Sequence, residues 1–298
     1  MERKKYGAID IGSNAVRLLL VNVYYHENIT TFKKVSLVRV PIRLGSDVFD
    51  KGEISEKKAI DFERTMIAFE HLMKVHKVDQ YRACATSAMR DAKNGEKIIQ
   101  GVKERTDINI EIISGDEEAK IIRSTHIEER LEQNHDFLYV DVGGGSTEIS
   151  FYKNGELANS HSFNIGTIRL LNGQVTDEMW NDMQHWVKDI TNGHRDLDII
   201  GSGGNINKIY KILAKENWQG IEYPELQNLI KELNELDYDQ RMMKFRLHPD
   251  RADVIVFAGN IFERVMNWSE GGKIFVPKLG LADGLIKSMH KGLSYKDY

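Results

Sequence analysis

Several features that identify large classes of protein are scarce in this sequence. The 298 residues include one cysteine, Cys84, which lies in an apolar segment and is expected to be buried and reduced. The formal net charge is −4, and the basic residues are scattered, so no nucleic-acid surface is indicated. No apolar run is long enough to span a bilayer. These absences favour a cytoplasmic protein that binds neither nucleic acid nor membrane.

Common catalytic and nucleotide-binding motifs are also missing. The chain has no G-x-x-x-x-G-K-[ST] phosphate loop, no G-x-G-x-x-G at the start of a helix and no G-x-S-x-G elbow. Its ten histidines show no metal-ligand spacing. The N-terminal stretch "MERKKYGAID" is charged and then enters a strand, so no signal peptide is expected. These absences argue against a P-loop, a dinucleotide-binding turn, a histidine metal site and a serine-hydrolase elbow.

One arrangement occurs twice in the chain. The segments "YGAIDIGSNAVRLLL" (6–20) and "LYVDVGGGSTEIS" (138–150) each contain an apolar run, an aspartate, an apolar residue, a glycine, a small polar turn and a second strand. Asp10 corresponds to Asp141. This duplication predicts two related domains.

Length and pattern support the same division. About 150 residues per domain is an ordinary size. Each half begins with strands in hairpins and continues with alternating helices and strands, which predicts a mixed α/β sheet. We place the domains at residues 1–130 and 131–298, with the boundary in the polar segment "LEQNHD". The terminal helix, about 282–292, is a candidate to pack back on the first domain.

Glycine-rich turns at strand ends are suited to phosphate, because glycine lets successive backbone N–H groups converge on one anion. A third turn, "GSGGN" (201–205), precedes a helix, whose N-terminus also favours anions. Asp10, Asp141 and the nearby Glu148 would repel phosphate unless a cation lies between, and Mg²⁺ accepts such ligands. The predicted phosphate-binding residues are Gly12, Ser13, Asn14, Arg17, Gly143, Gly144, Gly145, Ser146, Thr147, Gly203 and Gly204.

Two glutamates are candidates for proton transfer. "SGDEEAK" places Glu117 and Glu118 in the first turn of a helix, where acidic residues are also common for reasons of the helix dipole alone. Either could act as the general base for a water molecule. Glu148 is a second candidate, as a base or beside the metal. Arg90, which follows a strand end, could bind phosphate with its forked donors.

Five segments together resemble one family. "AIDIGSNAVRLLL", "RACATSAMRDA", "IEIISGDEEAKII", "YVDVGGGSTEIS" and "IIGSGGNINKI" are similar, in order, to the exopolyphosphatase and guanosine pentaphosphate phosphatase (Ppx/GppA) family. The resemblance implies two ribonuclease-H-like (actin-like ATPase superfamily) domains with mixed five-stranded sheets flanking a central cleft. It also implies Glu118 as base, Arg90 near the phosphates, Asp141 and Glu148 as the acidic residues beside the second phosphate loop, and Asp10 as part of the first loop. From the residues themselves, the predicted metal ligands are Asp10, Asp141 and Glu148. The chain resembles the short, two-domain form.

The implied activity is Mg²⁺-dependent removal of the terminal phosphate of linear polyphosphate, conversion of pppGpp to ppGpp in the stringent response, or both. Two alternatives stay open: an ATP-dependent kinase or ATPase of the same superfamily, and a non-catalytic sensor of guanosine penta- or tetraphosphate. The sequence does not rank these substrates. It does not fix the oligomeric state either, and a homodimer is one expected form.

Overall fold

The chain forms two compact units, which are described separately. The computed structural model describes residues 2–27, 29–123, 136–194, 197–216 and 218–290. The first unit is Met1–Thr125 with Leu279–Tyr298, and the second is His126–Lys278. The boundary predicted between residues 130 and 131 lies outside the described residues.

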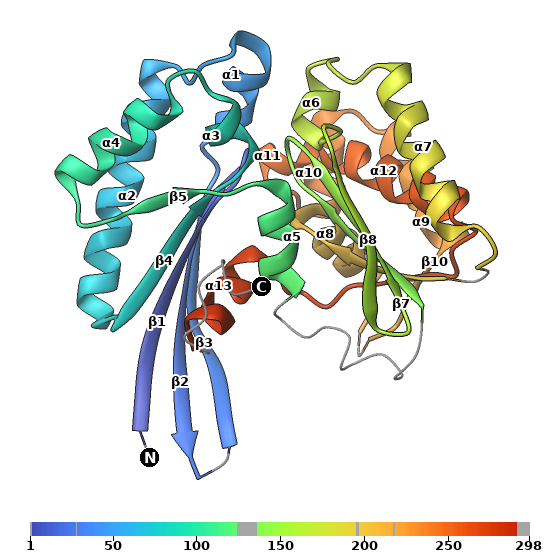
Figure 1. The fold of residues 1–298 in the computed structure, drawn as a ribbon. Coiled ribbons are helices and arrows are strands. Elements are labelled where there is room, and N and C mark those ends of the chain that lie inside the picture. The colour runs from blue at the N-terminus through green and yellow to red at the C-terminus, as the bar shows by residue number, and fades with distance from the viewer. Residues whose placement is uncertain (1, 28, 124–135, 195–196, 217, 291–298) are drawn as a thin grey trace. The chain divides into compact units, whose positions relative to one another are not determined.

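The first unit is built on a five-stranded mixed sheet (Figure 1). Its strands are β1 (Glu2–Ile11), β2 (Val16–His26), β3 (Ile29–Val40), β4 (Gln80–Ala85) and β5 (Ile110–Ile112), arranged in the order β3-β2-β1-β4-β5. The strands β1, β2 and β3 are antiparallel, whereas β4 and β5 run parallel to β1.

Helices cover both faces of this sheet. They are α1 (Leu44–Lys51), α2 (Glu56–His76), α3 (Ser87–Asp91), α4 (Gly95–Arg105), α5 (Gly115–Arg123) and α13 (Leu281–His290). A Cβ on Gly7 would lie 3.0 Å from the sulfur of Met73, so α2 covers the face of β1 to which Gly7 points. On the opposite face, Arg82 of β4 donates a hydrogen bond to Ser288 of α13. The last described helix therefore packs on the first unit's sheet.

The second unit repeats this topology with one addition. Its strands are β6 (Phe137–Val142), β7 (Thr147–Lys153), β8 (Glu156–Phe163), β9 (Asp198–Ser202), β10 (Ile221–Glu222) and β11 (Lys273–Phe275), arranged in the order β10-β11-β9-β6-β7-β8. The α/β class and the mixed sheets are confirmed, but this sheet has six described strands where five were predicted. The sixth, β10, is a two-residue edge strand, too short to leave a periodic signal.

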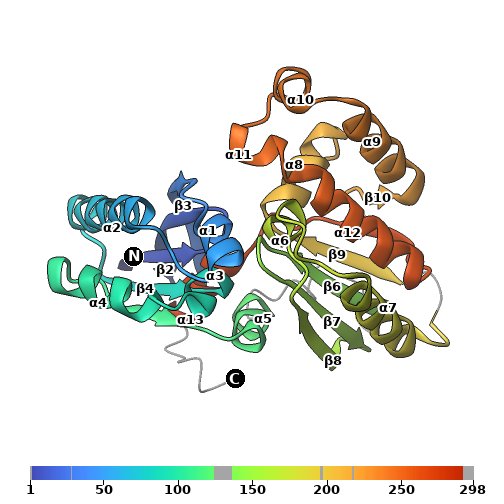
Figure 2. The same cartoon turned by 90° about the horizontal axis from the view of Figure 1, so that it is seen from above.

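In the second unit, apolar side chains from the helices and the strands form one buried cluster. Figure 2 shows these helices and strands from above. The helices are α6 (Thr167–Leu171), α7 (Asp177–Thr191), α8 (Gly204–Ile212), α9 (Tyr223–Glu235), α10 (Tyr238–Phe245), α11 (Pro249–Ala252) and α12 (Ile255–Trp268). The apolar helix α12 contacts α6, α7, α8 and α9. No described helix combines the length and apolar character needed to cross a membrane.

Candidate functional site

The duplicated segments form two hairpins with the same hydrogen-bond geometry. In the first, the Gly12 amide donates to the carbonyl of Ala15 at 3.2 Å, and in the second the Gly143 amide donates to the carbonyl of Ser146 at 2.9 Å. The register also matches, because each aspartate lies opposite the residue seven positions later: Asp10 opposite Arg17, and Asp141 opposite Glu148. The predicted repeat is therefore present in three dimensions.

In the second hairpin, the loop carbonyls are held by helix α6. Gly143 and Gly144 accept hydrogen bonds from the amides of Thr167 (3.0 Å) and Ile168 (2.8 Å), and the carbonyl of Gly145 accepts one from Arg169 Nε at 2.8 Å. In a trans peptide the N–H points away from the C=O of the same peptide unit. The amides of Gly144, Gly145 and Ser146 therefore point away from α6, in an arrangement suited to an anion.

The first loop is held in the same way. The carbonyls of Ser13 and Asn14 accept hydrogen bonds from the amides of Gly45 (2.8 Å) and Arg43 (3.0 Å), at the start of α1. The amides of Asn14 and Ala15 consequently point away from α1. The Ser13 hydroxyl is buried and lies 2.9 Å from that of Ser87, so this side chain anchors the loop.

Close glycine contacts, which the sequence analysis did not single out, hold these loops. A Cβ on Gly166, just before α6, would lie 2.4 Å from the carbonyl oxygen of Gly144. A Cβ on Gly45 would lie 2.9 Å from the Cβ of Ser13. Each half of the sequence has a glycine after its third strand. The sequence does not show which atoms these two glycines contact, because the contacting residues are distant in the chain.

The third loop lies against the second hairpin. Ser202 of β9 pairs with Asp141, and a Cβ on Gly203 would lie 3.3 Å from Asp141 Oδ1. Gly203 has a φ of 113°, which strongly favours glycine. Helix α8 begins at Gly204, so its N-terminal amides lie beside the same carboxylate and add a second region that favours anions.

The two aspartates have different partners. Arg17 Nη1 lies 2.6 Å from Asp10 Oδ2, so the first carboxylate is in an ion pair. Asp141 and Glu148 are cross-strand partners, so both side chains are on one face, and both residues are buried. Glu148 Oε1 also accepts a 2.8 Å hydrogen bond from Ser162. Adjacent buried carboxylates resist joint ionisation unless positive charge is close.

The composition of this carboxylate pair fits magnesium. Within the part of the chain that the structure describes, no three or more His, Cys, Asp or Glu side chains gather into a metal cluster. Mg²⁺ usually binds one or two carboxylates and completes its shell with water and phosphate oxygens. Asp141 and Glu148 could provide the two carboxylates.

The Thr147 hydroxyl has a structural role. It donates to the carbonyl of Ile165 at 2.6 Å and is fully buried. This bond joins the second hairpin to the segment before α6. The Thr147 hydroxyl is therefore already engaged with Ile165. The predicted role of Thr147 in substrate binding would be to stabilise the loop, whose backbone would contact the substrate.

The structure distinguishes the two candidate glutamates. Glu117 and Ser114 form a capping box: the Ser114 amide donates to Glu117 Oε2 at 2.7 Å, and the Glu117 amide to Ser114 Oγ at 3.2 Å. The Glu117 carboxylate is thus engaged in starting α5. Glu118, one residue later, is half-buried.

Asp10 and Glu118 both act electrostatically on the buried thiol of Cys84. Burial raises the pKa of the Cys84 thiol to about 12, and the negative charges of Glu111, Asp10 and Glu118 add to this increase. Cys84 is the cross-strand partner of Asp10. Asp10 and Glu118 therefore both lie within electrostatic range of one buried thiol, in a single unit.

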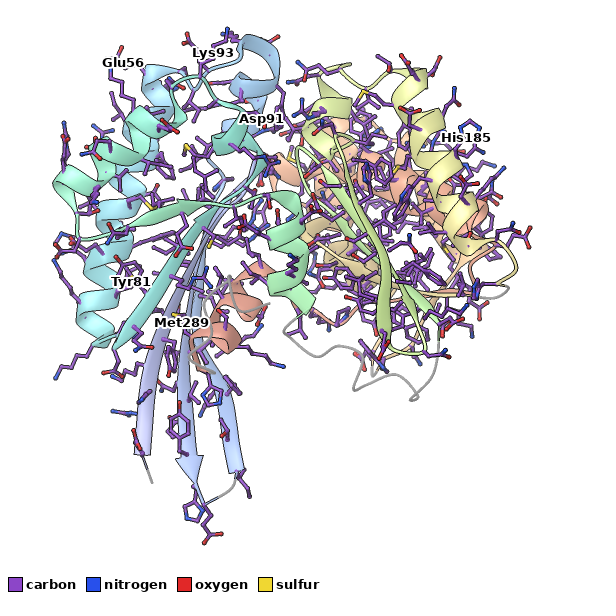
Figure 3. All side chains as sticks on the ribbon, in the orientation of Figure 1. Glu56, Tyr81, Asp91, Lys93, His185 and Met289 are labelled. Carbon is purple, nitrogen blue, oxygen red and sulfur yellow. The ribbon has the colours of Figure 1, made fainter. Side chains whose placement is uncertain are left out.

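Arg90 is held at the same end of the sheet. Arg90 lies in the last turn of α3, where its Nη1 donates to the carbonyl of Ile113 at 2.9 Å and its Nε lies 3.7 Å from Asp91 Oδ1. Asp91 is labelled in Figure 3. The guanidinium is thus fixed beside the segment that leads from β5 into α5.

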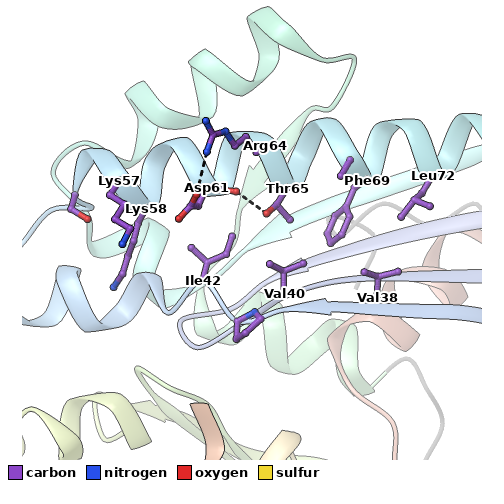
Figure 4. Close-up of a pocket in the computed structure, with 13 residues that line it drawn as sticks. Val38, Val40, Ile42, Lys57, Lys58, Asp61, Arg64, Thr65, Phe69 and Leu72 are labelled. Atoms are coloured by element: carbon purple, nitrogen blue, oxygen red, sulfur yellow. Dashed lines mark hydrogen bonds and ion pairs between the residues drawn. The ribbon is translucent and has the colours of Figure 1, made fainter. Parts of the chain in front are cut away.

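A separate hollow lies between β3 and α2, with a volume of about 620 Å³ (Figure 4). Its walls are mainly apolar, with Lys57, Lys58 and Arg64 at the α2 side. None of its lining residues belongs to a glycine loop or to α5. It is therefore not the site predicted from the sequence.

Curated relatives match part of their own length. The chain is 30% identical over 298 residues to a bifunctional 3-dehydroquinate synthase/phosphatase from Fusobacterium nucleatum, covering 90% of this chain and 44% of that protein. It is 27% identical over 177 residues to exopolyphosphatase 1 from Mycobacterium tuberculosis, covering 58% of this chain and 50% of that protein. The chain thus spans about half the length, or less, of these relatives.

Solved structures share the fold over almost the whole chain. An exopolyphosphatase from Cytophaga hutchinsonii superposes with a TM-score of 0.84 at 24% identity, covering 98% of this chain and 99% of that one. The Aquifex aeolicus Ppx/GppA family member gives 0.76 at 23% identity, with coverage of 98% and 99%. The model of the Ppx/GppA phosphatase family matches residues 23–292, and the chain belongs to that family.

Proposed function

We propose that the protein is a Mg²⁺-dependent phosphohydrolase that removes the terminal phosphate of linear polyphosphate, of pppGpp, or of both. The observation that carries the proposal is the repeated hairpin. Both loops have their carbonyls tied to a following helix, so their amides are oriented for phosphate. Family membership and a relative named an exopolyphosphatase support the same reaction class.

The loop amides would bind phosphate oxygens without help from long side chains. Asn14 and Ala15 supply amides in the first loop, and Gly144, Gly145 and Ser146 supply them in the second. The substrate is a string of closely spaced negative charges, which preorganised N–H groups stabilise without reorganisation during the reaction. In the second loop, Gly144 and Gly145 let the backbone approach the anion closely.

Glu118 is proposed as the general base. Its carboxylate would accept a proton from a water molecule while the water oxygen attacks the terminal phosphorus. The bond from that phosphorus to its bridging oxygen breaks, and the electron pair leaves with the shortened chain. Glu117 is excluded from this role in the proposal because its carboxylate caps α5.

Asp141 and Glu148 would hold the magnesium ion, whereas Asp10, the third predicted ligand, belongs to the other unit and forms an ion pair with Arg17. When bound, Mg²⁺ would offset negative charge on the phosphate oxygens. Arg90 would stabilise developing charge on the transferred group. Its bond to the carbonyl of Ile113 fixes it beside the strand that precedes α5.

A phosphate-release panel tests this proposal. Tripolyphosphate, long-chain polyphosphate, pppGpp, GTP and ATP are compared with and without Mg²⁺, for the native chain and for Glu118→Ala. We expect Mg²⁺-dependent release from polyphosphate or pppGpp that exceeds release from ATP. Faster release from ATP would favour the ATPase or kinase alternative, and tight binding of pppGpp or ppGpp without hydrolysis would favour the sensor.

A further inference from the structure

A cationic cluster lies beyond the third glycine loop, within the second unit. It consists of Lys208 and Lys211 on α8, Arg246 at the end of α10, and Arg251 on α11. Lys208 Nζ donates to the carbonyl of Arg246 at 3.3 Å, which joins the two helices. Arg246 has a φ of 49°, an unusual left-handed conformation for a residue other than glycine.

Like charge dominates around Lys208. Burial lowers the pKa of its ammonium group, and the charges of Lys211, Arg251 and Arg246 lower it further. Every charged neighbour that shifts the pKa of Lys208 is a cation. Among the described residues, no carboxylate forms an ion pair with Lys208, Lys211 or Arg246.

Such a cluster has a local electrostatic cost, although the chain as a whole carries a net charge of −4. Like charges at close range destabilise the folded state, and an anion bound among them removes the repulsion. The neighbouring glycine loop is proposed to bind phosphate chains, which are anions of this kind. The cluster therefore has the charge that an extended phosphate ligand requires.

The position of the cluster extends the proposed site. Helix α8 starts at Gly204, next to Asp141, and Lys208 lies four residues later, or about 6 Å along the helix axis. Side chains on a helix incline towards its N-terminus, which directs the Lys208 stem back towards the loop. These ammonium groups are therefore candidates to contact phosphates beyond those held by the loops.

We infer that the cationic cluster forms a second anion subsite, which binds phosphates distant from the one cleaved. Its members are Lys208, Lys211, Arg246 and Arg251. The inference rests on the proposed function. The shared ligand chemistry is a second group of phosphates on the same substrate. It could come from the interior of linear polyphosphate or from the 3′-diphosphate of pppGpp. The subsite would set the preference for these substrates over simple triphosphates.

The test compares two double variants that remove the same charge. Lys208→Gln/Lys211→Gln alters the cluster, and Lys188→Gln/Lys231→Gln removes two exposed lysines from α7 and α9 of the same unit. For each, kcat and KM are measured with long-chain polyphosphate, tripolyphosphate, pppGpp and GTP. Circular dichroism confirms that both variants are folded.

The cluster variant should lose on the order of tenfold in kcat/KM through KM, with kcat retained, because two charge-assisted contacts are removed. A loss confined to long-chain polyphosphate over tripolyphosphate assigns the subsite to the polymer. A loss confined to pppGpp over GTP assigns it to the 3′-diphosphate. Equal losses on long and short substrates, or a loss matched by the control variant, overturn the inference.

Direct binding separates this inference from the proposed function. The affinity of long-chain polyphosphate is measured by calorimetry for the native chain and both variants, independently of turnover. If no substrate is hydrolysed, the proposed function fails, and a selective loss of polyphosphate affinity in the cluster variant still supports the subsite. Unchanged affinity in that variant contradicts it.

Discussion

Arg17 and Glu148 occupy equivalent positions in the two hairpins, and they carry opposite charges. Each is the cross-strand partner of the aspartate seven residues earlier. In the first hairpin the result is an ion pair between Arg17 and Asp10. In the second it is a pair of buried carboxylates, Asp141 and Glu148. The same hairpin therefore contains an ion pair in one unit and two neighbouring buried carboxylates in the other.

This difference predicts where magnesium acts. Chelation should abolish phosphate release, and Glu148→Gln should raise the Mg²⁺ concentration for half-maximal activity by about tenfold or more, by analogy with other losses around metal sites. Activity is measured across a Mg²⁺ titration. The control is Glu156→Gln, on an exposed part of the neighbouring strand β8, which should leave the titration unchanged. Full activity in excess chelator would contradict the assignment.

The two adjacent glutamates of α5 should separate cleanly. Glu118→Ala should lower kcat by about 10²–10⁴-fold, because it removes the proposed base. Glu117→Ala should instead lower the free energy of unfolding by about 1 kcal/mol, because it removes half of the capping box, with most turnover retained. Steady-state kinetics and denaturant unfolding measure the two effects. The reverse pattern would transfer the catalytic role to Glu117.

The loop contact of Gly166 should be intolerant of a methyl group. In Gly166→Ala the new Cβ would meet the Gly144 carbonyl, which has no room to yield without moving the loop. The φ of Gly166 is −138°, so backbone strain does not contribute. We expect kcat/KM to fall by about 10²-fold through displacement of the loop amides. Gly101→Ala is the control, because its Cβ meets nothing within 4 Å. Equal activity of the two variants would show that the loop is not rigidly held.

Helix α13 should position the helix that carries Glu118. A Cβ on Gly284 would lie 2.3 Å from the carbonyl oxygen of Ile121, three residues after Glu118. Gly284→Ala should displace α5 and lower kcat by about 10- to 100-fold, with a smaller change in KM. The matched control is Gly280→Ala, four residues earlier, where a Cβ meets no atom within 4 Å. A change in unfolding free energy with unaltered kcat would restrict Gly284 to a structural role.

Local patterns explain how much of this fold could be predicted. The strand, aspartate and glycine of each hairpin are contiguous, so their repeat and the mixed sheets could be recognised in the sequence. The Ser114 cap and the acidic first turn of α5 also follow from local chemistry. The choice between Glu117 and Glu118 also has a local basis, because the S-x-x-E spacing from Ser114 places the Glu117 carboxylate, and not that of Glu118, where it accepts from the Ser114 amide.

Contacts between distant residues explain what could not be predicted. The roles of Gly166 and Gly284 depend on backbone groups 22 and 163 residues away, Gly144 and Ile121. The cationic cluster joins Lys208 to Arg246 across 38 residues. No periodicity or spacing in one sequence encodes such pairs, because each residue type is ordinary in its own segment.

Hydrogen exchange at the two loops tests the central claim most directly. In the Glu118→Ala variant, with Mg²⁺ and polyphosphate present, the amides of Asn14 and Ala15 and those of Gly144, Gly145 and Ser146 should exchange more slowly than in the free protein. The amides of the β3 segment Thr30–Phe32, away from both loops, provide the internal control. Protection at both loops is the predicted result. Unchanged exchange at either loop under saturating polyphosphate would contradict the account that both hairpins bind phosphate through their backbone.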